Sequence, residues 1–258
     1  MKRVRHAFPQ GNGVVPALWD FDLEIPAGQF LTIVGPSGCG KTTLLAMVGG
    51  LVFPRQGEVL LDGRAVTGPP AEVAYMLARD ALMPWRTARQ NVEFGLEIRG
   101  QSRDLRRQKS AEWLDRVGLT AFADSKINEL SQGMRQRVAI ARTLALEPRC
   151  LLMDEPFAAL DAQTRMLLQQ EFLRLWERVN ATVIFVTHDL GEAILLGDRV
   201  VLVSHRPGRV VADVAVAIPR PRTTEIELDD PNFRRYHRLL SGQLKTEVRA
   251  QLSPAEDE

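Results

Sequence analysis

The sequence lacks the features of a membrane-spanning, a secreted or a disulfide-rich protein. No apolar run approaches the about 18 residues that a spanning helix needs, and residues 1–13 lack the apolar stretch of a signal peptide. Two cysteines, Cys39 and Cys150, make no disulfide framework. We therefore expect a chain that stays in the cytosol, a reducing compartment, from which it can dock on a membrane protein.

An excess of either charge is also missing. The 258 residues hold 33 basic and 32 acidic side chains, so nothing indicates a surface dedicated to nucleic acid or anionic lipid, and we expect no nucleic-acid partner. No internal repeat or low-complexity tract is found. With 45% hydrophobic residues the chain can bury a full core, either as one large domain or as a domain with an inserted lobe.

Four short apolar runs predict strands that are covered on both faces, because they do not alternate with polar residues. Helical patterns lie between them, so an α/β fold with a largely parallel sheet is expected. Ligands of such sheets bind beyond the carboxyl ends of the strands, and polar clusters directly follow the first three runs. The runs are "FLTIV" at 30–34, "CLLM" at 150–153, "TVIFV" at 182–186 and "RVVLV" at 199–203.

The first polar cluster, "GPSGCGKTT" at 35–43, fits the P-loop pattern and stands between a predicted strand and a predicted helix. In such a loop backbone N–H groups face the β-phosphate of a nucleotide, Lys41 reaches the β and γ oxygens, and the Thr42 hydroxyl ligates Mg²⁺. The loop therefore predicts a bound nucleotide and Mg²⁺. The predicted cradle consists of Gly35, Pro36, Ser37, Gly38, Cys39, Gly40, Lys41, Thr42 and Thr43.

The other two clusters supply acid–base groups. Asp154 is a candidate Mg²⁺ ligand and Glu155 a candidate general base for the attacking water, although a pair of helix-capping carboxylates is the alternative. His188 follows the third run. A lone histidine there is usually structural, but three strand ends that bring phosphate, metal and imidazole together favour a catalytic role.

A second anion-binding pattern appears in "LSQGMRQRVAIAR" at 130–142, where Ser131 and Gly133 precede a helical run with three arginines. Its presence beside a complete P-loop needs an explanation.

The rest of the sequence predicts three further parts. The pattern at about 87–135 predicts an inserted helical lobe, and the patterns at 4–8 and 19–30 predict short antiparallel strands. The pattern at 231–252 predicts one amphipathic helix.

In chain order, "GPSGCGKTT", "LSQGMRQRVAIAR", "CLLMDEPFAALD" at 150–161 and "TVIFVTHDLGEA" at 182–193 resemble the P-loop, signature, acidic-strand, D-loop and switch-histidine motifs of ATP-binding-cassette ATPases. The resemblance implies a P-loop NTPase with a mixed, largely parallel core sheet, a small antiparallel β subdomain and the inserted helical lobe. It also implies ATP and Mg²⁺ as cofactors, an ATPase domain over 1–215 and a C-terminal extension over 216–258.

In this family two cassettes pack head to tail, and the signature of one closes on the ATP held by the P-loop of the other. The resemblance therefore assigns the second anion site to a neighbouring subunit, in a homodimer or a heterodimer. Its signature role falls on Ser131, Gln132 and Gly133, with Gln132 in place of the commoner glycine, and its D-loop on 158–161, including Asp161. Phe8 is the candidate for stacking on adenine, with a core phenylalanine as the alternative.

Within the family, "ALMPWRTARQNV" at 81–92 and "RPGRVVADVAVAIPRPR" at 206–222 resemble the ATPase subunits of nitrate, sulfonate and taurine importers. The resemblance implies a peripheral subunit on the cytoplasmic face of the membrane. It would be paired with an integral membrane permease and served indirectly by a substrate-binding protein.

One departure from the family concerns the glutamine expected seven residues before Trp85, where this chain has Ala78. In relatives that glutamine touches Mg²⁺ or the attacking water and links the nucleotide to the helical lobe. The main hypothesis is thus an import ATPase, and the alternative is a weakly hydrolysing cassette with a regulatory or structural role. A soluble DNA-repair or translation cassette is disfavoured, because no long coiled-coil insertion separates Ala78 from Ser131.

Overall fold

The computed structural model describes residues 1–11, 13–77, 81–223 and 230–252. The chain divides into two compact units, one formed by 1–70 and 182–258 and the other by 71–181. Of the described helices, none is both long and apolar enough to cross a membrane.

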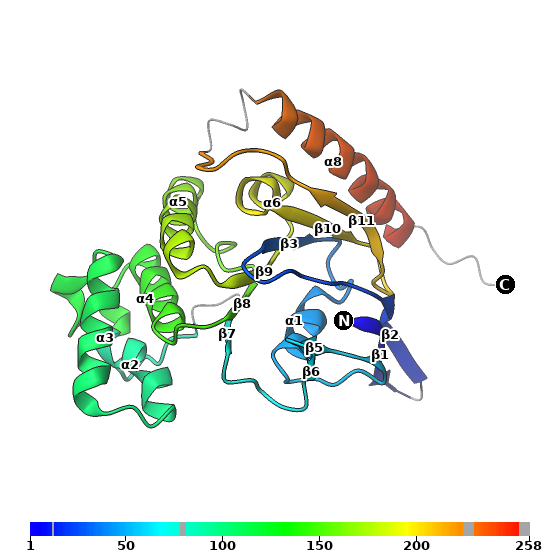
Figure 1. The fold of residues 1–258 in the computed structure, drawn as a ribbon. Coiled ribbons are helices and arrows are strands. Elements are labelled where there is room, and N and C mark those ends of the chain that lie inside the picture. The colour runs from blue at the N-terminus through cyan, green and yellow to red at the C-terminus, as the bar shows by residue number, and fades with distance from the viewer. Residues whose placement is uncertain (12, 78–80, 224–229, 253–258) are drawn as a thin grey trace. The chain divides into compact units, whose positions relative to one another are not determined.

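The first unit is built around a sheet with the strand order β11-β10-β3-β9. β3 runs parallel to both β9 and β10, whereas β11 is antiparallel to β10. All five residues of β3 are buried. Helices α1 and α6 lie on opposite faces of this sheet (Figure 1). The elements are β3 (Phe30–Val34), α1 (Lys41–Val48), β9 (Thr182–Thr187), α6 (Leu190–Leu196), β10 (Arg199–Val203) and β11 (Val210–Ala215).

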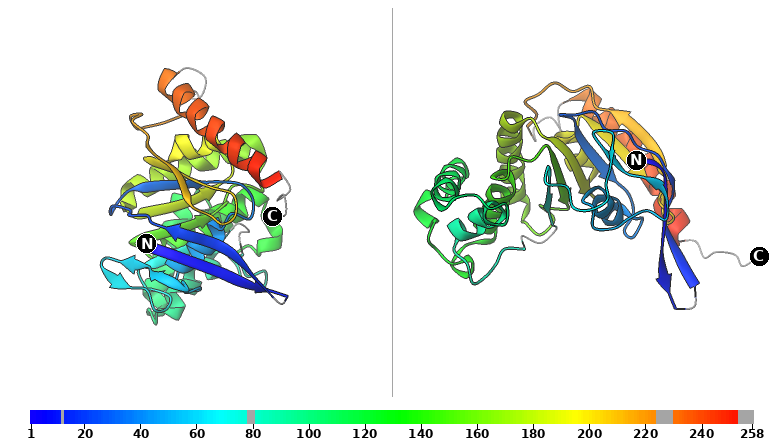
Figure 2. Two further views of the ribbon diagram at one scale, coloured as in Figure 1. Left: turned by 90° about the vertical axis from the view of Figure 1, so that its right-hand side faces the viewer. Right: turned by 60° about the horizontal axis from the view of Figure 1, so that its bottom comes forward.

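A smaller antiparallel sheet, with the order β2-β1-β4, belongs to the same unit, and β5 pairs with β6 beside it. Its β1–β2 ribbon is drawn in blue in both views of Figure 2. The second strand ends at Phe21, earlier than the predicted 19–30, because the chain leaves the ribbon before Pro26. These strands are β1 (Lys2–Gln10), β2 (Gly13–Phe21), β4 (Gln56–Glu58), β5 (Leu60–Leu61) and β6 (Arg64–Ala65).

The amphipathic C-terminal helix α8 (Pro231–Leu252) has the predicted bounds and packs on α6. Its buried Phe233 and Leu240 share a core cluster with Ile194 and Val200. One face of α8 is apolar and buried, and the opposite face carries exposed arginines. This separation repeats every 3.6 residues, so the periodicity of the sequence was enough to predict the helix.

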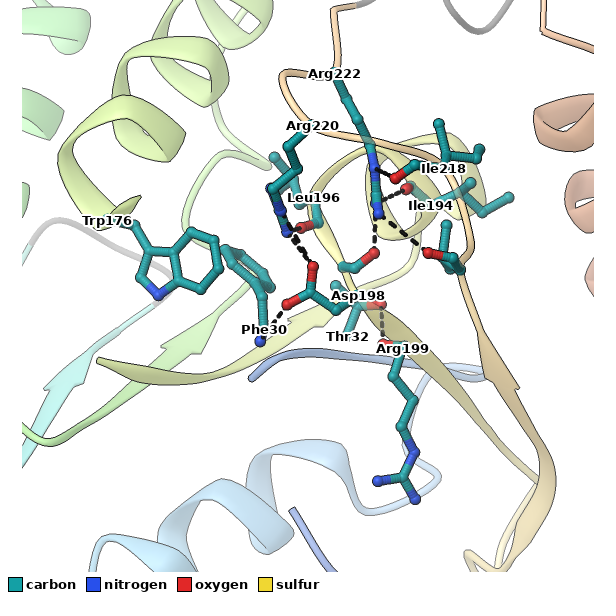
Figure 3. A network of polar contacts seen from close by, with 12 residues as sticks. Phe30, Thr32, Trp176, Ile194, Leu196, Asp198, Arg199, Ile218, Arg220 and Arg222 are labelled. Carbon is teal, nitrogen blue, oxygen red and sulfur yellow. Dashed lines mark hydrogen bonds and ion pairs between the residues drawn. The ribbon is translucent and has the colours of Figure 1, made fainter. Parts of the chain in front are cut away.

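The segment that leads to α8 is fastened to the unit by two arginines (Figure 3). Arg220 binds the carboxylate of Asp198, whose other oxygen accepts the Phe30 N–H at 2.9 Å. Arg222 is only 4% exposed, and burial is the main cause that lowers its pKa to about 10, so it keeps its charge at neutral pH. Four carbonyl oxygens surround its guanidinium, those of Ile194, Gly197, Val216 and Ile218.

The second unit combines a parallel strand pair, β7 and β8, with helices drawn mostly in green in Figure 2. β8 is fully buried, as its unbroken apolar run predicted. The fold class is confirmed: a mixed, largely parallel sheet, a small antiparallel sheet and a helical lobe. The elements of this unit are β7 (Val73–Met76), α2 (Ala88–Ile98), α3 (Arg103–Arg116), α4 (Gln132–Leu144), β8 (Cys150–Asp154) and α5 (Ala162–Val179), with 3₁₀ turns at Thr120–Phe122 and Ile127–Glu129.

Candidate nucleotide site

The predicted P-loop connects the end of β3 to the start of α1, with Gly35 directly after the strand and Lys41 as the first helical residue. The N-terminus of α1 offers unpaired N–H groups and the positive end of the helix dipole, which favour an anion. Gly38 and Gly40 have φ angles of 76° and 102°, in the left-handed region where glycine is strongly preferred. The loop is thus shaped by its sequence to turn sharply into α1.

Gly40 is also required by its own neighbours. A Cβ there would lie 2.9 Å from the Ala17 carbonyl oxygen and 2.9 Å from the Leu18 side chain, both in β2. At Gly38 a Cβ would meet nothing within 4 Å. The antiparallel ribbon therefore presses on one side of the loop while the Gly38 side stays open.

The carbonyl oxygens of the loop accept hydrogen bonds from side chains, one of them buried and two exposed. The Lys41 ammonium is buried and donates to the carbonyls of Gly35, at 2.7 Å, and Pro36, at 2.9 Å. The next two carbonyls, of Ser37 and Gly38, accept from Gln251 and Arg206. These last two residues could not be predicted, because sequence spacing gives no sign that they meet the loop.

Cys39 lies within the loop but faces the protein interior, since its Sγ would be 2.9 Å from a Cβ at Gly35. Its side chain is 1% exposed, and burial raises the pKa of its thiol, with the Lys41 charge opposing that shift. Because the thiolate is the reactive form, this thiol is expected to react slowly.

His188 and the P-loop leave adjacent parallel strands at the same level, because Val34 pairs with Thr187. His188 is exposed, and the backbone after it is fixed: the Asp189 N–H donates to Thr187 Oγ1 at 3.0 Å, and the Asp189 carboxylate caps α6. The structure therefore brings the phosphate loop and the predicted switch histidine to one edge of the sheet.

Phe8 lies in β1 and is 40% exposed, with its ring 4.6 Å from that of His6 in an edge-on arrangement. A core phenylalanine would be buried, so this partly open ring remains available for stacking. Its role toward adenine stays a prediction.

In the second unit, Asp154 is the last residue of β8 and is 7% exposed, with Glu155 immediately after the strand. Burial, followed by the negative charge of Asp154, raises the pKa of the Tyr75 hydroxyl on the paired strand. Glu155 has a φ of 45°, a left-handed conformation that is unfavourable for a residue with a Cβ. Such strain is typical of functional sites.

The signature and the D-loop are joined within this unit. The Gln132 carboxamide donates to the Ala159 carbonyl at 2.7 Å, and the buried Gln136 donates to the Pro156 carbonyl at 2.6 Å. Gly133 also packs closely, since a Cβ there would lie 3.0 Å from the Thr164 methyl group. The two segments are therefore positioned by each other.

Ser131 and Asp161 each cap a helix. The Ser131 hydroxyl accepts the Met134 N–H at the start of α4, and the Asp161 carboxylate accepts the Thr164 N–H at the start of α5. The hydrogen bonds from Thr164 are the largest cause of the lowered pKa of Asp161. Ala78, the departure from the family pattern, lies outside the described residues.

Comparison with known proteins decides the family. Residues 18–158 match the family model described as ABC transporter. The chain belongs to the ABC transporter family. The cassette is thus an ATP-binding ATPase, and its predicted resemblance to the nitrate, sulfonate and taurine type is confirmed by the relatives below.

Three relatives show how far the similarity extends. The cassette is 49% identical to an uncharacterized ABC transporter ATP-binding protein of Methanocaldococcus jannaschii, over 91% of this chain and 86% of the relative. It is 40% identical to the nitrate import ATP-binding protein NrtD of Synechocystis sp., over 94% and 93%. It is 47% identical to the taurine import ATP-binding protein TauB of Yersinia pestis, over 76% and 77%.

A solved structure is similar in fold. It is a dimeric ATP-binding cassette in a post-hydrolysis state, bound to ADP and phosphate, and it matches the cassette with a TM-score of 0.74 and 33% identity. The match covers 84% of this chain and 98% of that one.

The Gln132 contact generates a prediction. Gln132→Ala removes the donor to the Ala159 carbonyl and frees the D-loop, so we expect kcat for ATP hydrolysis to fall about 2- to 10-fold with KM for ATP unchanged, the loss of one hydrogen bond. Steady-state ATPase kinetics measure both constants. Gln163→Ala, at an exposed position of α5, is the matched control. A kcat equal to that of the control would show that the contact has no role in turnover.

Proposed function

We propose that the cassette is the ATPase subunit of an importer for nitrate, sulfonate, taurine or a related small organic solute. The observation that carries the proposal is the similarity, over three quarters or more of the chain, to nitrate and taurine import ATP-binding proteins. The complete set of P-loop, signature, acidic and histidine motifs supports it. The cassette would bind an integral permease at the cytoplasmic face of the membrane, and a substrate-binding protein would deliver the solute to that permease.

Two copies of the cassette would form a head-to-tail dimer, a homodimer in the simplest case. The chain carries both halves of a composite site, and a solved relative is dimeric. The Gln132–Ala159 bond supports the same arrangement, because it lets one subunit present its signature and its D-loop together to the ATP of the other.

The two proposed ligands suit Mg²⁺, because the Thr42 hydroxyl and the Asp154 carboxylate are hard oxygen donors. Mg²⁺ is usually held by one or two protein oxygens together with substrate phosphates, so these two side chains would be enough. When bound, the ion neutralises charge on the phosphates.

The chain's own groups would carry out the remaining chemistry. The Lys41 ammonium would turn from the loop carbonyls to the β and γ oxygens. A carboxylate oxygen of Glu155 would take the proton of the attacking water, and the His188 ring would hydrogen bond to the γ-phosphate. The helix N-terminus at Lys41 would stabilise the negative charge of the β-phosphate throughout.

The proposal predicts the behaviour of Glu155→Gln. Glutamine keeps the shape but cannot accept the proton, so ATP should bind while hydrolysis falls at least about 100-fold and the closed dimer accumulates. Size-exclusion chromatography with light scattering, with and without ATP, measures the dimer. Glu177→Gln, at an exposed position of α5, should resemble wild type. A Glu155→Gln protein that stays monomeric at saturating ATP would contradict the composite site.

Ala78 favours the alternative, a weakly hydrolysing regulatory or structural cassette, because residues 74–85 contain no glutamine. Ala78→Gln would restore one neutral ligand or hydrogen bond, so we expect ATPase activity to rise about 2- to 13-fold. Ala121→Gln, in the helical lobe, is the control. Purified wild type that turns over at a typical rate, with no gain from Ala78→Gln, would mean that another group has taken the glutamine's place.

A further inference from the structure

The P-loop is contacted, at Gly38 and Cys39, by a loop that leaves the neighbouring strand. Val34 of β3 pairs with Leu202 of β10, so residues 204–209 emerge beside the P-loop at the same edge of the sheet. This loop is tied to β2, because the Gly208 N–H donates to the Ala17 carbonyl at 2.9 Å. A Cβ at Gly208 would lie 2.2 Å from the Cys39 carbonyl oxygen, so only glycine lets the two loops approach so closely.

Two side chains from the C-terminal part of the chain donate hydrogen bonds to the carbonyls of Ser37 and Gly38. Arg206 Nε donates to the Gly38 carbonyl at 3.2 Å. Gln251 Nε2, in the last turn of α8, donates to the Ser37 carbonyl at 3.2 Å across 214 positions of sequence. Together with the two bonds from Lys41, they give a side-chain donor to each of the four consecutive carbonyls from Gly35 to Gly38.

These bonds fix the direction of the amides on the other side of the loop. In a trans peptide the carbonyl of one residue and the N–H of the next lie in one plane and point in opposite directions. Holding the Ser37 carbonyl therefore aims the Gly38 N–H away from Gln251. Holding the Gly38 carbonyl fixes the Cys39 N–H on the opposite side of its peptide plane, where it donates to the Pro36 carbonyl at 3.4 Å and closes the turn. An anion-binding concavity needs backbone N–H groups that are held in fixed directions.

The far end of α8 is supported well enough to hold Gln251 in place. Glu247, one turn earlier, accepts the His205 backbone N–H at 3.0 Å and lies 2.7 Å from His205 Nδ1. The near end is fastened by the buried Phe233 and by the Arg220 and Arg222 network (Figure 3). The His205–Glu247 contacts therefore hold α8 and the 204–209 loop together where both meet the P-loop.

We propose that Arg206 and Gln251 are positioning residues that preorganise the P-loop amides for the phosphates of ATP. The inference deepens the proposed function, on which it rests, and assigns a role to the C-terminal helix. Neither side chain needs to touch the nucleotide. Each acts through a carbonyl of the cradle, so its loss lets a peptide plane rotate and weakens phosphate binding without unfolding the unit.

The two residues should differ in effect. Arg206 makes a charge-assisted bond, and its loss should raise the Kd for ATP about ten-fold, whereas the neutral Gln251 should contribute about three-fold. Since the two bonds fix adjacent peptide planes, the double variant should lose at least the product of the two. Arg206→Lys keeps a donor and a charge, so it should recover part of the affinity.

The experiment measures the Kd for ATP by isothermal titration calorimetry on the full chain, for Arg206→Ala, Gln251→Ala, the double variant and Arg206→Lys. Arg238→Ala, at an exposed position of α8, is the matched control. Thermal melting without nucleotide should move by under about 2 °C in the single variants. Gln251→Glu provides a second check, because a carboxylate of the same shape cannot donate to a carbonyl and should bind ATP at least as poorly as Gln251→Ala.

The inference is supported if affinity falls in the predicted order while melting is unchanged. It is overturned if wild type binds ATP and both alanine variants bind as tightly as Arg238→Ala, or if the affinity loss only follows a loss of stability. ATP binding by wild type, the reference of the titration, tests the proposed function separately.

Discussion

The nucleotide site depends on one short loop whose peptide planes must be held in fixed directions, with its carbonyls bound by side chains of the protein. A free Gly-rich loop would sample many peptide orientations, since glycine restricts φ least. Here Lys41 holds two carbonyls, Gln251 and Arg206 hold the next two, and β2 limits the space beside Gly40. Parts from both ends of the chain therefore converge on the phosphate loop.

In the second unit, side chains likewise hold the backbone of the signature and the D-loop in place. Ser131 and Asp161 cap helices α4 and α5. The carboxamides of Gln132 and Gln136 donate to carbonyls in and next to the D-loop. Glu155, the residue proposed to activate water, has a left-handed φ of 45° directly after the buried strand β8. Hydrogen bonds that hold the surrounding segments in place are what a preorganised site needs.

The parts that local patterns encode could be predicted from sequence. The continuous apolar runs gave β3, β8, β9 and β10, and periodicity gave α8 with its exact bounds. The edge strand β11 was missed, because its residues alternate between half-buried and exposed. Arg206 and Gln251 could not be foreseen, since their contacts depend on strand order and on where a helix 214 positions away ends. The effect of Ala78 on ATP turnover stays a prediction, because residue 78 lies outside the described residues.

The central claim is that each ATP site joins the P-loop of one subunit to the signature of another, and mixing two variants tests it most directly. Lys41→Ala disables the P-loop, and Gly133→Asp places a carboxylate in the signature. Each protein alone should be inactive. In a head-to-tail heterodimer both lesions fall in one site, so an equal mixture should recover up to about a quarter of wild-type ATPase activity. A mixture as inactive as its components would contradict the account.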